Sequence, residues 1–157
     1  MTPAVDLLRA LGIAHEVLEY HDHPGGGPYG ENAARALGVD PTSVFKTLLA
    51  TLDDGSTVVG IVPVPTRLDL KALATAAGAK RAEMAEATVA ERRTGYVVGG
   101  ISPFGQKRPS PTYVDEWATA LDTVLVSGGR RGLELAVPPH AFADALDARF
   151  VPIASWP

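Results

Sequence analysis

The 157-residue chain contains no cysteine, and this absence excludes several kinds of chemistry at once. A disulfide framework, a thiolate metal site and a cysteine nucleophile on the protein itself are all ruled out. The sequence also lacks a G-x-S-x-G motif, a G-x-x-x-x-G-K-[ST] phosphate loop and a G-x-G-x-x-G turn after a strand. We therefore do not expect a serine hydrolase of the nucleophile-elbow type, a P-loop nucleotidase or a dinucleotide-binding enzyme.

Long apolar runs and a strong basic charge are missing as well. No apolar stretch approaches the length of a membrane span, and the first residues lack the basic start and apolar run of a signal peptide. We therefore expect a cytoplasmic protein. The net charge of −4 disfavours a general nucleic-acid coat, which would be basic. The length, without a repeat or a low-complexity segment, predicts a single domain over residues 1–157.

Histidine is scarce, and its placement gives only a weak metal motif. His21 and His23 flank Asp22 in a segment rich in glycine and proline, which predicts a loop. Structural zinc sites use four ligands and catalytic ones three plus water, and no third strong ligand stands beside this pair. We expect a solvated loop here, no metal site and no cofactor.

The most informative stretch is residues 43–52, in which β-branched and large apolar residues precede the turn Asp53-Asp54-Gly55. This pattern predicts a strand that enters a hairpin, with residues 57–62 as its partner. Both faces of the strand are largely apolar, and Lys46 is the exception. Two interpretations are open for Lys46. It is either a lysine near a strand end with its head in water, or the mark of a cleft that receives an anion or a polarised carbonyl.

The rest of the chain alternates helix and strand signals. Apolar periodicity, with caps or prolines before it and glycines after it, predicts short helices at residues 2–11, 31–37, 69–77, 86–93 and 138–146. Extended segments are predicted at residues 13–20, 80–84, 112–114, 123–127, 133–137 and 150–153. Together these elements predict an α/β fold with a largely antiparallel sheet.

Two glycine-rich segments are candidates for binding. In residues 94–105 a short strand is predicted to run into a loop with paired glycines and a proline. In the second segment, Gly128-Gly129-Arg130-Arg131-Gly132 follows a predicted strand. Glycines let a ligand approach the main chain closely and expose amide N–H groups.

Four segments, in this order, resemble one known family. V-F-K-T-L-L around Lys46, L-D-L-K-A-L-A at residues 68–74, T-G-Y-V-V-G-G-I-S-P-F-G-Q-K at residues 94–107 and V-S-G-G-R-R-G-L-E-L from Val126 are similar to the YbaK family. This is the family of stand-alone bacterial Cys-tRNA(Pro) deacylases, related to the editing domain inserted in bacterial prolyl-tRNA synthetases. The resemblance spans nearly the whole chain. It implies one α/β domain with a mixed, mostly antiparallel sheet surrounded by helices, and a cleft lined by the lysine strand and both glycine loops.

The resemblance also implies site residues. Lys46 matches the family's essential lysine, and residues 99–103 match a G-x-x-x-P loop whose amides face the aminoacyl carbonyl, so the catalytic candidates are Lys46, Gly100 and Ile101. The substrate-binding candidates are Tyr20, Tyr29, Gly99, Ser102, Pro103, Ser127, Gly128 and Glu134. Glu134 stands where the family pattern has aspartate, which leaves its role in binding the substrate amine open. The glycine run at residues 25–27 also departs from the pattern and bears on selectivity.

The implied reaction is trans-editing of mischarged Cys-tRNA(Pro), with Cys-tRNA(Cys) as a further candidate. The chain offers no obvious nucleophile, and the resemblance implies that the substrate's own thiol attacks its ester carbonyl. Lys46 would anchor the terminal phosphate or adenosine; a general-base role is the alternative and needs a strongly lowered pKa. The implied partners are the aminoacyl-tRNA and prolyl-tRNA synthetase. Two other functions stay open: a water-based deacylase of an ester such as Ala-tRNA(Pro), and a non-catalytic protein that binds tRNA or a synthetase.

Overall fold

The computed structural model describes residues 1–21 and 29–157, without the side chain of Tyr29. The helices are α1 (Pro3–Ala10), α2 (Tyr29–Leu37), α3 (Leu70–Ala76), α4 (Ala87–Thr94) and α5 (His140–Leu146), with two 3-10 helices, η1 (Pro41–Ser43) and η2 (Glu116–Ala120). The strands are β1 (Glu16–Glu19), β2 (Phe45–Leu52), β3 (Thr57–Pro63), β4 (Arg67–Leu68), β5 (Ala82–Met84), β6 (Thr112–Asp115), β7 (Val124–Ser127), β8 (Leu133–Val137), β9 (Arg149–Val151) and β10 (Ala154–Ser155).

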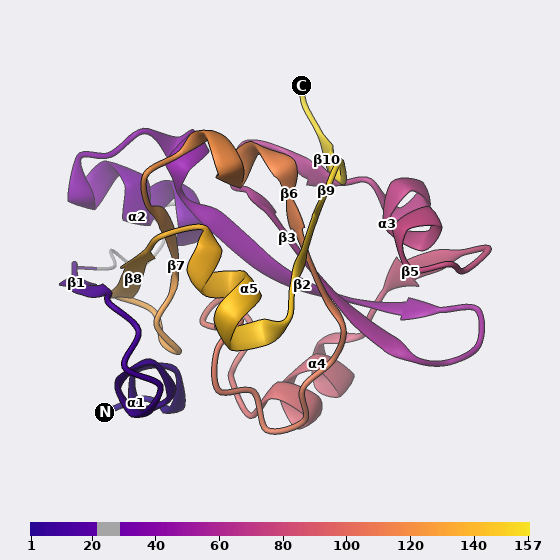
Figure 1. Ribbon diagram of the computed structural model, residues 1–157, viewed down its shortest axis with the longest axis horizontal. Helices are drawn as coiled ribbons and strands as arrows, with labels where there is room; N and C mark the ends of the chain where they lie inside the picture. Colours follow the sequence, from indigo (N-terminus) through magenta and orange to yellow (C-terminus); the bar gives the residue numbers. More distant parts are fainter. Residues whose placement is uncertain (22–28) are drawn as a thin grey trace.

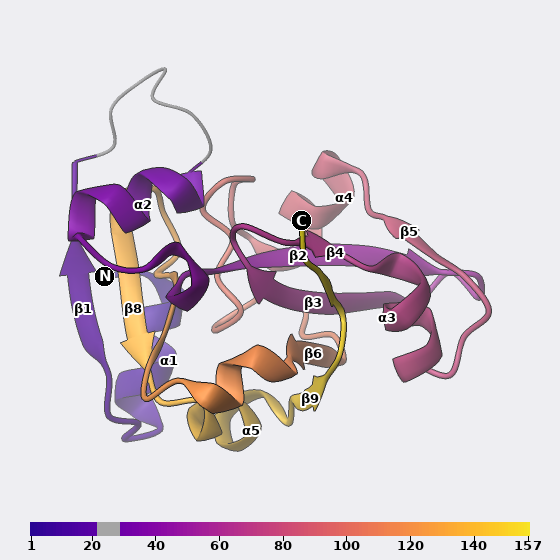
Figure 2. The ribbon, with the colours of Figure 1, turned by 90° about the horizontal axis from the view of Figure 1, so that it is seen from above.

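The described strands form three sheets with the orders β5-β2-β3-β6-β9, β1-β8-β7 and β10-β4. Figures 1 and 2 show the β1-β8-β7 sheet at the end of the molecule where α1 lies, with the larger sheet extending towards α3 and β5. The pairs β3–β6 and β6–β9 are parallel, and the other strand pairs are antiparallel. The predicted α/β fold with mixed, mostly antiparallel pairing is confirmed. No helix of the described residues is long and apolar enough to cross a membrane.

The predicted hairpin around Lys46 forms the centre of the larger sheet. β2 pairs with β3 from Phe45 opposite Pro63 to Thr51 opposite Thr57. On its other edge β2 pairs with β5 only through residues 50–52. Among the described residues, one isolated parallel bridge, from Val44 directly before β2 to Leu125 of β7, joins this strand to the smaller sheet. β2 therefore links both sheets, and part of one edge stays outside the ladders.

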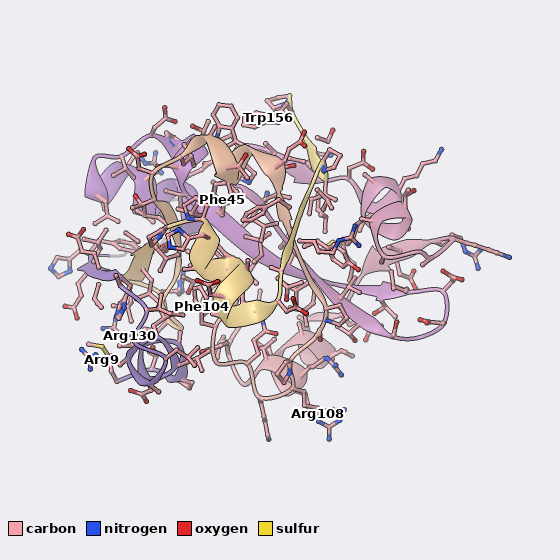
Figure 3. All side chains as sticks on the ribbon, viewed as in Figure 1. Arg9, Phe45, Phe104, Arg108, Arg130 and Trp156 are labelled. Carbon is pink, nitrogen blue, oxygen red and sulfur yellow. The ribbon has the colours of Figure 1, made fainter. Side chains whose placement is uncertain are left out.

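The core lies on both sides of β2, as the two apolar faces predicted. Phe45 and Leu49 belong to the larger cluster, in which the rings of Phe104 and Phe142 stack with centroids 5.4 Å apart. Ala50 and Leu52 belong to a second cluster that packs against α3. In Figure 3, Phe45 and Phe104 lie within the body of the molecule, whereas Arg9, Arg108 and Arg130 project from its margin. Burial on both faces fixes the strand's position and twist.

The predicted short strand at the start of residues 94–105 is wrong. Gly95 ends α4 with φ of 80°, and the Tyr96 amide then donates to Thr94 Oγ1. The Gly100 amide donates to the Val97 carbonyl at 2.8 Å, which closes a turn. Because these main-chain groups bond within the segment, they are not available to a neighbouring strand. The sequence also gave no signal for β4 and β10, since two residues are too few to show a period.

A buried carboxylate fastens the end of the chain to this sheet. Asp115, at the end of β6, is 4% exposed. Its Oδ1 accepts hydrogen bonds from the amides of Ile153 (3.0 Å) and Ala154 (2.8 Å), and its Oδ2 accepts one from the Trp117 amide (3.0 Å). Three donors to one buried carboxylate replace the water that the group loses on folding.

We expect Asp115→Ala to lower the free energy of unfolding by about 3 kcal/mol, because it removes these bonds and leaves buried amides unpaired. Denaturant unfolding followed by circular dichroism measures the loss. Asp54→Ala is the matched control, since Asp54 accepts similar local bonds from Ser56 in an exposed hairpin turn, and its cost should stay near or below about 1 kcal/mol. Equal losses in the two variants would contradict the anchoring role.

Candidate active site

A cavity of about 580 Å³ lies along β2. Its walls come from residues 44–49, from α4 and the segment before it, from the loop at residues 98–101, and from the ends of β7 and β8. Most of these residues are apolar, and the charged exceptions are Glu31, Lys46 and Glu134. An apolar cavity with a few polar groups is the usual form of a small-molecule site.

The structure brings together five of the residues predicted from sequence. Lys46, Gly99, Ile101, Ser127 and Glu134 line the cavity, although they come from four separate segments of the chain. The other described candidates, which are Tyr20, Gly100, Ser102, Pro103 and Gly128, are not among its lining residues. The side chain of Tyr29, like His23 and the glycine run at residues 25–27, lies outside the described residues.

Lys46 is half-buried on the wall of the cavity, so its position fits the interpretation of a lysine that marks a cleft. Among the described residues, its ammonium group makes no ion pair within 4 Å and no hydrogen bond. Burial is the main cause that lowers its pKa, the charge of Arg67 lowers it further, and the charge of Glu31 acts in the opposite direction. An unpaired cation in an apolar cavity is suited to bind an anionic or strongly polar ligand.

The Gly99–Gly100 loop presents main-chain donors, but not all of those predicted. The Gly100 amide is already used by the Val97 carbonyl, so its predicted role as a donor to the substrate carbonyl does not fit this geometry. Among the described residues, the amides of Gly99 and Ile101 donate no hydrogen bond, and both residues line the cavity. The candidate donors are therefore Gly99 and Ile101.

Ser127 holds the two glycine loops together. Its hydroxyl donates to the Gly100 carbonyl at 3.0 Å and accepts from the Gly129 amide at 3.1 Å. A Cβ added to Gly100 would lie 3.0 Å from Cα of Arg130, so a larger residue would require the main chain of the second loop to shift where the loops meet. Ser102 is fully buried and its Oγ accepts from the Phe104 amide, so it shapes the first loop from inside.

Glu134 brings an uncompensated carboxyl group into the cavity. It lies in β8 opposite Leu18 and Ser127, is 6% exposed, and its Oε2 has no hydrogen-bond partner among the described residues. Burial raises its pKa to about 8, so the neutral acid predominates at pH 7. Sequence analysis identified Glu134 as a candidate, but it did not show that Oε2 lacks a hydrogen-bond partner among the described residues.

Among the cavity residues that the sequence analysis did not name as site candidates, Thr47 brings an unpartnered polar group. Thr47 lines the cavity, is 8% exposed, and its Oγ1 is buried without a partner among the described residues. The available signal was a hydroxyl residue between Phe45 and Leu49 on an apolar face of the strand.

The family follows from comparison with known proteins. The model of the aminoacyl-tRNA editing domain matches residues 24–145, which include the lysine strand and both glycine loops. This chain belongs to the aminoacyl-tRNA editing domain family. A relative from Enterococcus faecalis, which bears the provisional name Cys-tRNA(Pro)/Cys-tRNA(Cys) deacylase EbsC, is 37% identical over 125 residues, 80% of this chain and 76% of the relative.

Solved structures share the fold of this editing domain. The crystal structure of hypothetical protein APE2540 covers 98% of this chain and 100% of its own, with a TM-score of 0.88 and 24% identity. The crystal structure of a protein provisionally described as a trans-editing enzyme for prolyl-tRNA synthetase covers 99% of both chains, with a TM-score of 0.84 and 22% identity. The predicted family, fold and enzyme class, an aminoacyl-tRNA deacylase, are thus confirmed.

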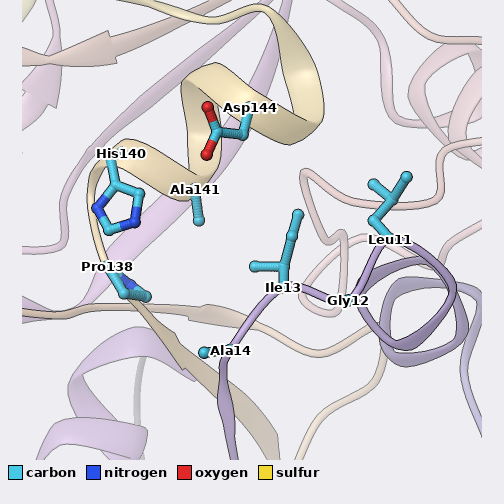
Figure 4. A pocket seen from close by; sticks show the side chains of 8 residues that line it. All are labelled: Leu11, Gly12, Ile13, Ala14, Pro138, His140, Ala141 and Asp144. Atoms are coloured by element: carbon cyan, nitrogen blue, oxygen red, sulfur yellow. The ribbon is translucent and has the colours of Figure 1, made fainter.

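A second hollow in the editing domain shares no lining residue with the cavity along β2. It measures about 350 Å³ and is bordered by Ile13, Pro138, His140 and Asp144, between α5 and the segment that follows α1 (Figure 4). No residue predicted for the site lines it. The larger cavity therefore remains the candidate active site.

The isolated carboxyl of Glu134 gives a prediction for stability against pH. The unfolded carboxyl ionises near its ordinary pKa of 4.5, whereas the folded one keeps its proton up to about 8. As the pH rises from about 4.5 to 8, the unfolded state is therefore favoured, by at most about 1.4 kcal/mol per pH unit. Glu134→Gln removes this dependence on pH. The free energy of unfolding of the variant, measured relative to wild type by denaturant unfolding, should therefore increase from pH 5 to pH 8. Parallel pH profiles of the two proteins would contradict the raised pKa.

Proposed function

We propose that residues 1–157 form a single deacylase domain that acts in trans on mischarged Cys-tRNA(Pro), with Cys-tRNA(Cys) as a further substrate. The main support is one cavity that combines the ammonium of Lys46 with the amides of Gly99 and Ile101, three groups that have no partner among the described residues. The name of the Enterococcus faecalis relative supports the choice of a cysteinyl ester. The cavity volume of about 580 Å³ suits an aminoacyl group with its terminal nucleoside.

The attacking group comes from the substrate. Among the described residues, the hydroxyl groups that line the cavity belong to Thr47 and Ser127, and no histidine lines it. The hydroxyl of Ser127 is engaged with both glycine loops. A hydroxyl nucleophile needs an adjacent base. A cysteinyl ester carries a better nucleophile of its own, in the form of the thiolate.

In the reaction, the cysteinyl sulfur attacks the carbonyl carbon of its own ester. The C–S bond forms as the ester C–O bond breaks, and the electron pair leaves with the ribose oxygen, which takes up a proton. The four-membered thiolactone that results is then opened by water to cysteine. The amides of Gly99 and Ile101 hold the oxyanion, because donors aimed at developing charge lower the barrier most.

Lys46 anchors the substrate as a cation. Its ammonium binds the terminal phosphate or adenosine, and its charge increases the thiolate fraction of a nearby thiol. The general-base role requires a neutral amine. The half-exposed position and the opposing effect of Glu31 on the lysine pKa favour the cation instead. The modest acidic charge of the chain fits a weak tRNA binder that receives its tRNA from prolyl-tRNA synthetase in the cytoplasm.

A water-based reaction on a smaller ester such as Ala-tRNA(Pro) is the second candidate. The observation that favours it is the carboxyl of Glu134, which lines the cavity with a pKa of about 8. A base whose pKa lies near the working pH is suited to activate water.

Deacylation of Cys-tRNA(Pro) and Ala-tRNA(Pro) separates the two candidates. We expect wild type to release cysteine at least about 100-fold faster than alanine, and Lys46→Met, which keeps an unbranched apolar stem and removes the ammonium group, to lose about 100-fold in kcat/KM. Lys71→Met on the exposed face of α3 is the matched control and should retain wild-type rates. Equal or faster loss of the alanyl ester would overturn the thiol mechanism, and Glu134→Gln would then test the water-based route.

A further inference from the structure

Within the described part of the chain, the edge of β2 that faces away from β3 is unpaired at one residue, Thr47. The Val64 amide donates to the Val44 carbonyl (2.8 Å), and the Leu52 amide donates to the Ser56 carbonyl (2.9 Å). Antiparallel pairs bond at every second residue, so the even-numbered residues of β2 bond to β3. The N–H and C=O of Thr47 therefore point to the opposite edge.

On that opposite edge the neighbouring strand stops short of Thr47. The Leu49 carbonyl accepts from the Ala85 amide at 3.0 Å, and the chain then leaves the sheet to begin α4. At the other end, Val44 makes its bridge to Leu125. Thr47 lies between these two contacts, and no hydrogen bond of its main chain occurs with the described residues on this edge.

The unpaired edge faces the candidate active site. All six residues from 44 to 49 line the cavity. Because neighbouring side chains of a strand point to opposite faces, an unbroken run of lining residues places the cavity along the strand's edge. The main chain of Thr47 is then a donor and an acceptor on the cavity wall, and its hydroxyl is a third group without a partner.

We propose that the aminoacyl group of the substrate binds beside Thr47 as one residue of an added β-strand. The Thr47 N–H donates to the ester carbonyl, and the Thr47 C=O accepts from the α-amino group. An aminoacyl ester carries its amine and its carbonyl on the same carbon, as a residue of an antiparallel strand does, and two such residues exchange both bonds. The inference rests on the proposed function and names how that site recognises its substrate class, an α-amino acid ester.

This arrangement also fixes where the substrate side chain goes. Directly opposed residues of adjacent strands place their side chains on the same face of the sheet. The side chain of an L-aminoacyl group therefore lies next to that of Thr47, on the face that Phe45 and Leu49 share. The unpartnered hydroxyl of Thr47 then meets the aminoacyl side chain. A D-aminoacyl group would direct its side chain to the face of Lys46 instead.

Replacement of one main-chain amide by an ester tests the proposal. The α-hydroxy analogue of threonine, incorporated at position 47, removes the Thr47 N–H and keeps the side chain. The same monomer at position 51 is the matched control, because Thr51 lies beyond Leu49, the last residue of β2 that lines the cavity, and is in register with Glu83 of β5. We expect the change at 47 to lower kcat/KM for Cys-tRNA(Pro) by at least about 10-fold, and the change at 51 to stay within about threefold.

A binding measurement tests whether the aminoacyl group binds beside Thr47, and it does not depend on catalysis. The probe is 3′-deoxy-3′-(cysteinylamino)adenosine, an amide that cannot be cleaved as the ester is. Hydrogen exchange by NMR should show the Thr47 amide slowed at least about 10-fold by a saturating concentration of the probe, with the Thr51 amide unchanged.

The outcomes separate this inference from the proposed function. A rate loss confined to position 47, or protection of the Thr47 amide alone, supports strand-like binding. Equal rates for the variants at 47 and 51, or no protection of Thr47 by the probe, overturns it. If wild type cleaves no cysteinyl ester but the probe still protects Thr47, the proposed function fails and the recognition mode holds.

Discussion

The incomplete pairing of β2 is the constraint on which the site depends. The strand is buried on both faces and bonded along the whole of one edge, so its position is fixed. On the other edge β5 ends early and the smaller sheet contributes a single bridge. A rigid strand with an open section of edge gives a wall in which main-chain groups are held in place before any ligand arrives. Such preorganised groups need no rearrangement during reaction.

The first glycine loop contributes Val98, Gly99 and Ile101 to the cavity wall, and one hydroxyl joins it to the second loop. Ser127 bonds to a carbonyl of the first loop and to an amide of the second, and Gly100 leaves no room for a side chain between its main chain and that of Arg130 without a shift. Thr2, the N-cap of α1, donates its hydroxyl to the Gly128 carbonyl, so the N-terminal helix supports the same junction. The loop amides on the cavity wall are thus positioned by the hydroxyl of Ser127, by the close packing at Gly100 and by the contact of Thr2 with the second loop.

Local signals in the sequence predicted most elements because these depend on near neighbours. The hairpin around Lys46 and the helices capped by Thr2 and Asp69 follow from such signals. Parallel pairing of β6 with β3 and β9 joins distant segments and leaves no local pattern. In the site, the lysine and the glycine loop stood out in the residue pattern, and the resemblance to a family implied their roles. The engaged amide of Gly100 could not be found, because it depends on the particular turn that the loop adopts.

The groups on the cavity wall that have no partner among the described residues, at Thr47 and Glu134, are both suited to bind a ligand with a charged amine. In the free protein, a neutral Glu134 avoids the cost of burying an isolated carboxylate. An ammonium group in the same cavity reverses this preference, since a nearby positive charge favours the ionised acid. Substrate with a charged amine would therefore bind with release of a proton from Glu134, and the carboxylate formed would strengthen the hold on the amine. The longer side chain of glutamate, in place of the aspartate of the family pattern, moves this carboxyl by one methylene. If the substrate binds as proposed, the balance between main-chain recognition at Thr47 and charge recognition at Glu134 would set how strictly the site requires a free α-amine.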